Sequence, residues 1–247
     1  MGAWHSKVKR IGLMILEFCY QLFTVVRPRH RDVVLGLVTV VFTGVATTPL
    51  AEQMIKSSLA AQRPVLMVLG DSLVAGHGLP QGEAFPEILG RMLQNDGVDV
   101  RIINAGVSGD TTAGGLARLD WSLADNPDAA IIVLGGNDLL RGLDPSASFV
   151  NLDKIITRLK ARNIAVLLAG MKAPRNFGAD YADEFDSIYQ RLVNHHNVLF
   201  YPFFLDGVAL QPMMNLADGM HPNKEGISHI AIKILPQVKK LLSKTEE

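Results

Sequence analysis

Short apolar runs recur along the chain from residue 65 onward. They span residues 65–69, 98–103, 129–134, 164–169 and 198–201. Runs of this length and composition predict five β-strands.

Helical periodicity fills the segments between these runs. Apolar residues follow the i, i+3, i+4, i+7 pattern over residues 85–93, 152–159 and 185–192. This spacing predicts helices that each bury one face. A last helix is expected to begin at Pro222 and to run to Leu242, with Pro236 kinking or splitting it.

The alternation of strands and helices predicts the architecture of residues 52–247. Strands joined by helical crossovers form a parallel sheet that is covered on both faces. We therefore expect an α/β fold, a three-layer α/β/α sandwich around a five-stranded parallel sheet. In such sheets the functional site lies in the loops at the carboxyl ends of the strands.

Residues 1–51 have the charge distribution of a leader. They hold six of the 24 basic side chains but two of the 24 acidic ones, so the rest of the chain carries a net charge of −4. The basic residues Arg27, Arg29 and Arg31 precede an apolar stretch of 14 residues, 33–46. A membrane span needs about 20 residues, so this stretch predicts an export signal with cleavage near Ala46 or Ala51.

The leader also contains a second apolar stretch, residues 11–26. It is interpreted as an amphipathic helix on the membrane surface, or as a sign that translation starts downstream. We expect export across a membrane, with either a cleaved leader or one that stays anchored. The alternative is a buried helix of a soluble protein.

Composition excludes several classes of protein. Hydrophobic residues make up 48% of the chain and charged residues 19%, which does not fit a disordered protein. Basic and acidic residues are equal in number, so nucleic acid is not an expected partner. The single cysteine, Cys19, excludes a disulfide framework and a C-x-x-C zinc site.

Polar residues with catalytic potential follow the predicted strands. Ser72 follows the first strand in a glycine-flanked turn, and Gly109 lies in a loop after the second, where Asp110 or Thr111 is expected to cap a helix. Asn137 follows two glycines after the third strand and offers an amide with two protons to donate. Each feature alone is also typical of ordinary turns and helix caps.

Asp218 and His221 precede the last helix and are three residues apart. This spacing allows a direct hydrogen bond that would fix the tautomer of the imidazole. Together the four loops supply a nucleophile, a base with its orienting carboxylate, and oxyanion donors, which are the parts of an acyl-transfer site. No H-E-x-x-H motif or second Asp/His cluster stands out, so we expect neither a metal nor another cofactor.

The ordered motifs resemble those of the SGNH/GDSL hydrolase family, in its bacterial periplasmic thioesterase I/lysophospholipase/arylesterase branch. The matching blocks are Gly-Asp-Ser-Leu at 70–73, Ser-Gly-Asp-Thr at 108–111, Gly-Gly-Asn-Asp at 135–138 and Asp-x-x-His-Pro at 218–222; residues 115–119, 140–142 and 201–204 are also similar. The resemblance implies a flavodoxin-like sandwich. It also implies a triad of Ser72, Asp218 and His221, with Ser72, Gly109 and Asn137 as oxyanion donors.

The expected substrates are small acyl esters or thioesters, lysophospholipids among them. We expect an apolar groove for the acyl chain, lined by Leu139, Leu140, Leu143, Phe177 and Tyr181. An alternative activity is that of a carbohydrate or peptidoglycan O-acetyl esterase. A non-enzymatic alternative, a flavodoxin-like module that binds phosphate or flavin, is disfavoured because it has no use for the Asp218–His221 pair.

Overall fold

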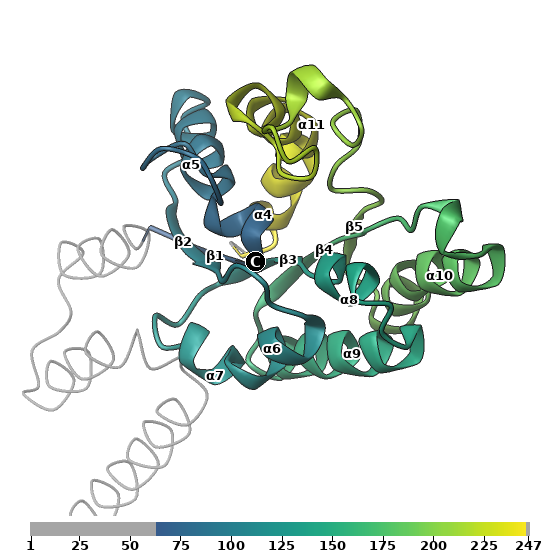
Figure 1. Cartoon of the computed structure of the whole chain (residues 1–247). Helices are drawn as coiled ribbons and strands as arrows, with labels where there is room; N and C mark the ends of the chain where they lie inside the picture. Colours follow the sequence, from purple (N-terminus) through teal and green to yellow (C-terminus); the bar gives the residue numbers. More distant parts are fainter. Residues whose placement is uncertain (1–62, 246–247) are drawn as a thin grey trace, which may run out of the picture. The chain divides into compact units, whose positions relative to one another are not determined.

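The computed structural model describes residues 63–245. Five parallel strands form one sheet in it, in the order β2-β1-β3-β4-β5 (Figure 1). The strands are β1 Val65–Gly70, β2 Arg101–Gly106, β3 Ala129–Val133, β4 Ala165–Ala169 and β5 Leu199–Tyr201. The predicted leader, with its export signal and second apolar stretch, lies outside the described residues.

Four of the five predicted strands are confirmed with small differences at their ends, and the second is displaced. Residues 98–100 lie before β2, which begins at Arg101 and continues to Gly106. The reason is pairing, because Arg101 is in register with Val65, the first residue of β1, and its N–H donates to the carbonyl of Pro64 at 2.9 Å. The partner strand therefore sets where β2 begins.

Helices cover both faces of the sheet and make the predicted three layers. They are α4 Ser72–Ala75, α5 Phe85–Asn95, α6 Thr112–Ala117, α7 Leu119–Ser122, α8 Gly136–Leu140, α9 Pro145–Ala161, α10 Ala179–His196 and α11 Lys224–Ser243. The helix α5 packs against α11 on one face, and α9 packs against α10 and α6 on the other (Figure 1). All residues of β1 and β3 are consequently buried.

The last helix differs from its prediction at two points. It begins at Lys224 instead of Pro222, because the side chain of Asn223 caps it by accepting a hydrogen bond from Gly226 N–H at 3.0 Å. The helix is also not split at Pro236. Pro236 and Ile232 are both exposed, so the proline lies on the outer face of the helix, where the carbonyl that loses its amide donor is not enclosed by the core.

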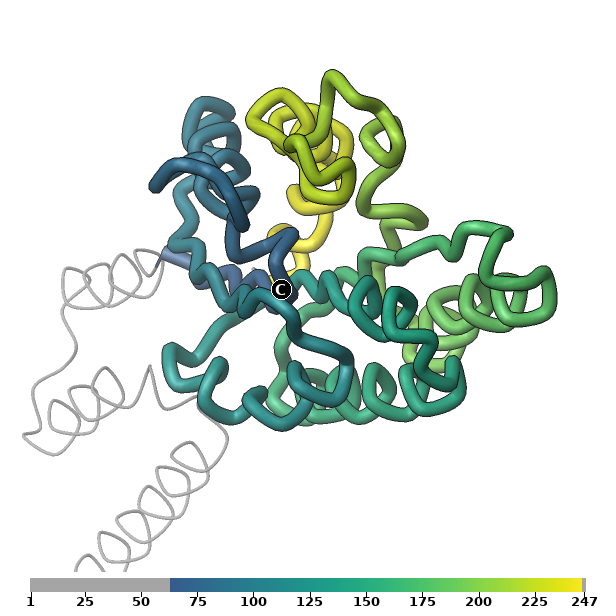
Figure 2. Tube along the Cα trace, in the orientation of Figure 1, coloured from purple at the N-terminus to yellow at the C-terminus, as the bar shows by residue number. Residues whose placement is uncertain are grey.

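The strand order places the carboxyl ends of β1 and β3 at the centre of the sheet. The chain moves outward from β1 to β2 and then returns to β3 on the other side, and such a reversal opens a crevice at the strand ends. The tube in Figure 2 shows how the end of the chain returns, as α11 near the C-terminus lies beside α5. No helix among residues 63–245 is both long and apolar enough to cross a membrane.

Candidate active site

Ser72 is the first residue of α4, directly beyond the end of β1. The short turn from strand to helix requires close packing against β2. A Cβ atom on Gly106 would lie 2.3 Å from the backbone nitrogen of Ala75, so a glycine is needed at the end of β2 for α4 to lie there. The Ser72 hydroxyl is thereby held at the central crevice.

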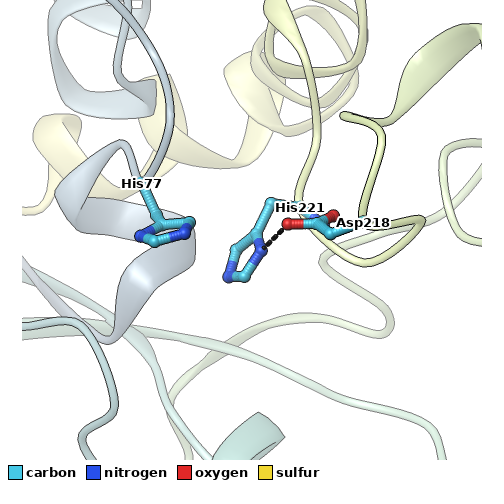
Figure 3. A group of neighbouring side chains, drawn as sticks. All are labelled: His77, Asp218 and His221. Carbon is cyan, nitrogen blue, oxygen red and sulfur yellow. Dashed lines mark hydrogen bonds and ion pairs between the residues drawn. The ribbon is translucent and has the colours of Figure 1, made fainter.

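A continuous pair of hydrogen bonds joins Ser72 to two residues far along the chain. The Nε2 atom of His221 lies 2.9 Å from Ser72 Oγ, across 149 residues of sequence. On the other side of the ring, Nδ1 lies 2.7 Å from Asp218 Oδ2, the direct bond that the three-residue spacing predicts (Figure 3). These three side chains have the arrangement of a nucleophile, a base and an orienting carboxylate.

The Asp218 carboxylate is held in its charged form. Its Oδ1 accepts hydrogen bonds from the backbone N–H groups of His221, at 3.0 Å, and Met220, at 2.8 Å. These bonds and the one from the His221 ring lower the pKa of Asp218 well below its usual range. A permanently ionised carboxylate keeps the proton of the imidazole on Nδ1 and leaves Nε2 free to accept the serine proton.

The Asn137 side chain lies at the same crevice, in the first turn of α8, and both of its amide protons have partners. Its Nδ2 atom donates to Asp71 Oδ2 at 3.1 Å and to the carbonyl of Asp110 at 3.0 Å. These two bonds fix the orientation of the amide between the loops after β1 and β2. The amide can donate to a substrate oxyanion by sharing one of these protons, as hydrogen bonds at a free site often rearrange when the substrate binds.

Asp71 is a buried carboxyl beside Ser72 that no sequence pattern marks as functional. Its Oδ1 accepts from Leu73 N–H at 3.0 Å, which caps α4, while Oδ2 accepts from Asn137. Burial raises the pKa of Asp71 to about 6, against the opposing effects of these two hydrogen bonds. One carboxyl group thus ties the Ser72 turn to the Asn137 loop.

The Gly109 loop is anchored from two sides. The carbonyl of Gly109 accepts from the Arg141 guanidinium at 2.7 Å. The next residue, Asp110, pairs with Arg118, which also donates to the carbonyl of Gly70 at 2.9 Å. Within the part of the chain that is described, the Gly109 N–H has no hydrogen-bond acceptor. That N–H is therefore available to a ligand.

Asp138, beside Asn137, ties the third loop to the second. It is buried and accepts hydrogen bonds from the N–H and hydroxyl of Thr112, at 2.8 and 2.6 Å, and from the Ser148 hydroxyl at 3.0 Å. Thr111 caps α6 by accepting from Gly114 N–H, which selects one of the two predicted caps. No local pattern of the sequence indicates this role of Asp138, because its buried partners Thr112 and Ser148 lie 26 and 10 residues away in the chain.

The five predicted groove residues divide into two groups. Leu139 is 7% exposed and packs into the core from α8, so it offers little surface to such a groove. Leu140, Leu143 and Phe177 are exposed, and the Tyr181 hydroxyl donates to the carbonyl of Leu143 at 2.8 Å. Tyr181 also stacks on Phe177, with ring centroids 6.0 Å apart.

The structure also brings together side chains that the sequence reading left apart. His77 lies against His221, with ring centroids 4.5 Å apart, and forms a group with Asp218 and His221 (Figure 3). A second group joins Asp153 on α9 to His195 and His196 on α10. The expectation that no second Asp/His cluster exists is therefore wrong. The sequence does not reveal this cluster, because about 40 residues separate Asp153 from the two histidines.

Comparison with known proteins gives consistent matches. The sequence profile of the GDSL-like Lipase/Acylhydrolase family matches residues 68–227. An arylesterase of Vibrio mimicus is 42% identical over 167 residues, which cover 67% of this chain and 84% of the relative. The thioesterase 1/protease 1/lysophospholipase L1 of Escherichia coli K12 is 36% identical over 185 residues, which cover 74% of this chain and 88% of the relative. The crystal structure of AlinE4, a SGNH-hydrolase family esterase, is 45% identical with a TM-score of 0.62, and the match covers 74% of this chain and 98% of AlinE4.

Proposed function

The chain belongs to the GDSL-like lipase/acylhydrolase family and is a serine ester hydrolase of the SGNH type, and we propose that Ser72 is its nucleophile. His221 is the general base in this proposal, and Asp218 holds the imidazole. The observation that carries it is the pair of hydrogen bonds from Asp218 through His221 to Ser72. Ordinary helix capping by Ser72 would not need that pair.

The first step transfers the acyl group to the enzyme. His221 Nε2 takes the proton of the Ser72 hydroxyl as Oγ attacks the acyl carbonyl carbon. The resulting imidazolium is stabilised by the Asp218 carboxylate. It then gives its proton to the leaving alcohol or thiol as the bond from the carbonyl carbon to that group breaks.

The negative charge of the tetrahedral intermediate requires donors that are already in place. We assign this role to the backbone N–H groups of Ser72 and Gly109 and to the amide of Asn137. The anchoring of the Gly109 loop by Arg141 supports the assignment, because preorganised donors need little rearrangement during the reaction. Asp71 orients the Asn137 amide, which shares one of its protons with the oxyanion.

The second step releases the acid. Water gives one proton to His221 Nε2 and attacks the acyl-enzyme carbonyl, and His221 returns that proton to Ser72 Oγ as the acyl–oxygen bond breaks. The cycle uses only these side chains and water.

Covalent labelling tests the nucleophile. A fluorophosphonate probe should label the wild-type protein on one serine and should not label Ser72→Ala. Ser228→Ala is the matched control, because Ser228 is a surface serine of α11 whose hydroxyl donates to the carbonyl of Lys224. Undiminished labelling of Ser72→Ala would refute the assignment.

We propose apolar acyl esters and thioesters, including lysophospholipids, as substrates. Leu140, Leu143 and Phe177 expose apolar surface beyond Asn137. The name of the E. coli relative includes both thioesterase and lysophospholipase, which supports this class. An O-acetyl esterase would instead need a small polar pocket.

A panel of nitrophenyl esters separates these activities. The proposal predicts that kcat/KM rises from the acetyl ester to esters of medium chain length, and that Phe177→Ala reduces this rise. Val150→Ala is the matched control, since Val150 is an exposed apolar residue on the outer side of α9. A preference for acetyl esters would favour the carbohydrate or peptidoglycan O-acetyl esterase.

We also propose that the leader exports the enzyme to the periplasm. The support is the basic cluster at 27–31 followed by the apolar stretch 33–46. A fusion of residues 1–60 to a reporter that is active only outside the cytoplasm should give signal. A silent reporter, with the full-length protein in the soluble cytosol, would refute export, and N-terminal sequencing would distinguish cleavage from anchoring.

A further inference from the structure

His77 lies beside the reacting groups, and the reaction steps above give it no role. It follows α4 and faces His221 from the side opposite Asp218 (Figure 3). The two imidazole rings have centroids 4.5 Å apart and are tilted by 42°. His77 is exposed, so a solute can reach it.

The backbone around His77 holds it over the site. The N–H groups of Gly76 and His77 both donate to the carbonyl of Ser72, at 3.2 Å. Gly78 has a positive φ of 73°, and a Cβ there would lie 2.6 Å from Leu216 Cδ1. The loop that carries His77 therefore packs against the segment that leads to Asp218, so the position of His77 is set by the fold.

We propose that His77, Asp218 and His221 bind a zinc ion that inhibits the enzyme, an inference that rests on the proposed function. Each of the three supplies one ligand atom, and these atoms lie within 4.8 Å of one another. Ligand atoms about 2.1 Å from a tetrahedral zinc ion are about 3.4 Å apart, so shifts of about an ångström complete the site. Two imidazoles and a carboxylate are a common set of zinc ligands, with water as the fourth.

Inhibition follows from the nitrogen of His221 that zinc takes. Asp218 lies 2.7 Å from Nδ1, so a zinc ion that both residues bind takes Nδ1 of the ring. The hydrogen bond between Asp218 and His221 is then lost, and with it the support for the imidazolium. The charge of Asp218 also favours a cation at this point. The base of the reaction is thereby disabled.

The second group, Asp153 with His195 and His196, provides an internal control. Its ligand atoms also lie within 4.8 Å of one another, with His196 Nε2 2.8 Å from Asp153 Oδ1. It lies where α10 ends, just before β5 begins, whereas the active-site loops follow the carboxyl ends of the strands. Zinc bound there should leave the active site untouched.

The test is a zinc titration of esterase activity. Tag-free protein is assayed on nitrophenyl acetate in a buffer that does not bind metals, with EDTA reversal and Mg²⁺ as a cation that prefers oxygen ligands. Wild type should lose activity with zinc and regain it with EDTA. His77→Ala, or His77→Gln if alanine disturbs the loop, should keep its activity without zinc and need at least about 10-fold more zinc for inhibition. His195→Ala should respond as wild type.

Several results would overturn the proposal: no inhibition of wild type by millimolar zinc, activation by zinc, equal sensitivity of both His77 variants and wild type, or lost sensitivity in His195→Ala. Activity without zinc reports on the proposed function separately, so the two failures are distinguishable. Equilibrium dialysis adds a measurement that needs no turnover. In a His195→Ala background, the further change His77→Gln should remove bound zinc.

Discussion

The substitution Asp71→Asn should change how the stability of the protein depends on pH. Burial raises the pKa of Asp71 from its usual 3.8 to about 6 in the native state. At a pH between 3.8 and about 6, Asp71 therefore keeps its proton in the native protein but has released it in the unfolded chain. The stability that Asp71 contributes must therefore fall as pH rises from about 4 to about 6.

The magnitude follows from the pKa interval. A difference of one pKa unit between two states corresponds to about 1.4 kcal/mol, so the interval from 3.8 to about 6 corresponds to about 3 kcal/mol. Asparagine cannot titrate, so Asp71→Asn lacks this fall. Asparagine also has one acceptor oxygen where Asp71 uses two, for Leu73 N–H and Asn137, and this lost hydrogen bond adds a destabilisation of about 1–3 kcal/mol that does not vary with pH.

Urea unfolding, followed by circular dichroism at several pH values from 4 to 7.5, measures both effects. The free energy of unfolding of the variant minus that of wild type should rise by about 3 kcal/mol over this range, whatever its starting offset. A difference that stays constant within about 0.5 kcal/mol would refute the reasoning. A carbon NMR titration of the Asp71 carboxyl checks the pKa directly, and a midpoint near 4 would also contradict it.

Other changes test the proposed site and its support. Ser72→Ala and His221→Ala should each lower kcat by about 10⁴–10⁶ with the fold retained, and more than a tenth of wild-type activity would contradict the assigned role. Asn137→Ala should lower kcat by about 10²–10³ with little change in KM, and Asn137→Asp should do at least as much damage; an effect on KM alone would make Asn137 a binding residue. Tyr189→Phe should lower stability by about 1 kcal/mol in a urea melt, because its buried hydroxyl donates to the carbonyl of Leu134 at 3.0 Å, and an unchanged midpoint would count against that bond.

Local pattern was enough to predict the layered α/β fold. Apolar runs of strand length and helical periodicity report how each segment buries itself, and the helices α5, α9 and α10 include the predicted segments 85–93, 152–159 and 185–192. Local pattern does not locate the start of β2, since Val98 and Val100 are apolar enough for a strand but residues 98–100 have no partner in β1. Strand ends depend on pairing, which the segment itself does not contain.

The site could be predicted in part for the same reason. Ser72, Gly109 and Asn137 follow the carboxyl ends of strands, and a parallel sheet brings these ends together at one edge. Asp218 and His221 are close in sequence, so their hydrogen bond could be expected. The residues that line a groove are harder to predict from the sequence. In α8, Leu139 faces the core and Leu140 faces solvent, and this difference depends on how the helix packs on the sheet.

Contacts between distant segments were decided by the tertiary structure alone. The bond from Asn137 to Asp71 joins residues 66 apart, and the rings of His77 and His221, with centroids 4.5 Å apart, belong to loops far apart in the chain. The sequence by itself determined the elements, the loops and the chemical groups that those loops hold, because periodicity and turn chemistry are local. Which carboxyl is buried, which amide it orients and which imidazole faces the base were set by packing across the sheet, and packing depends on all the elements at once.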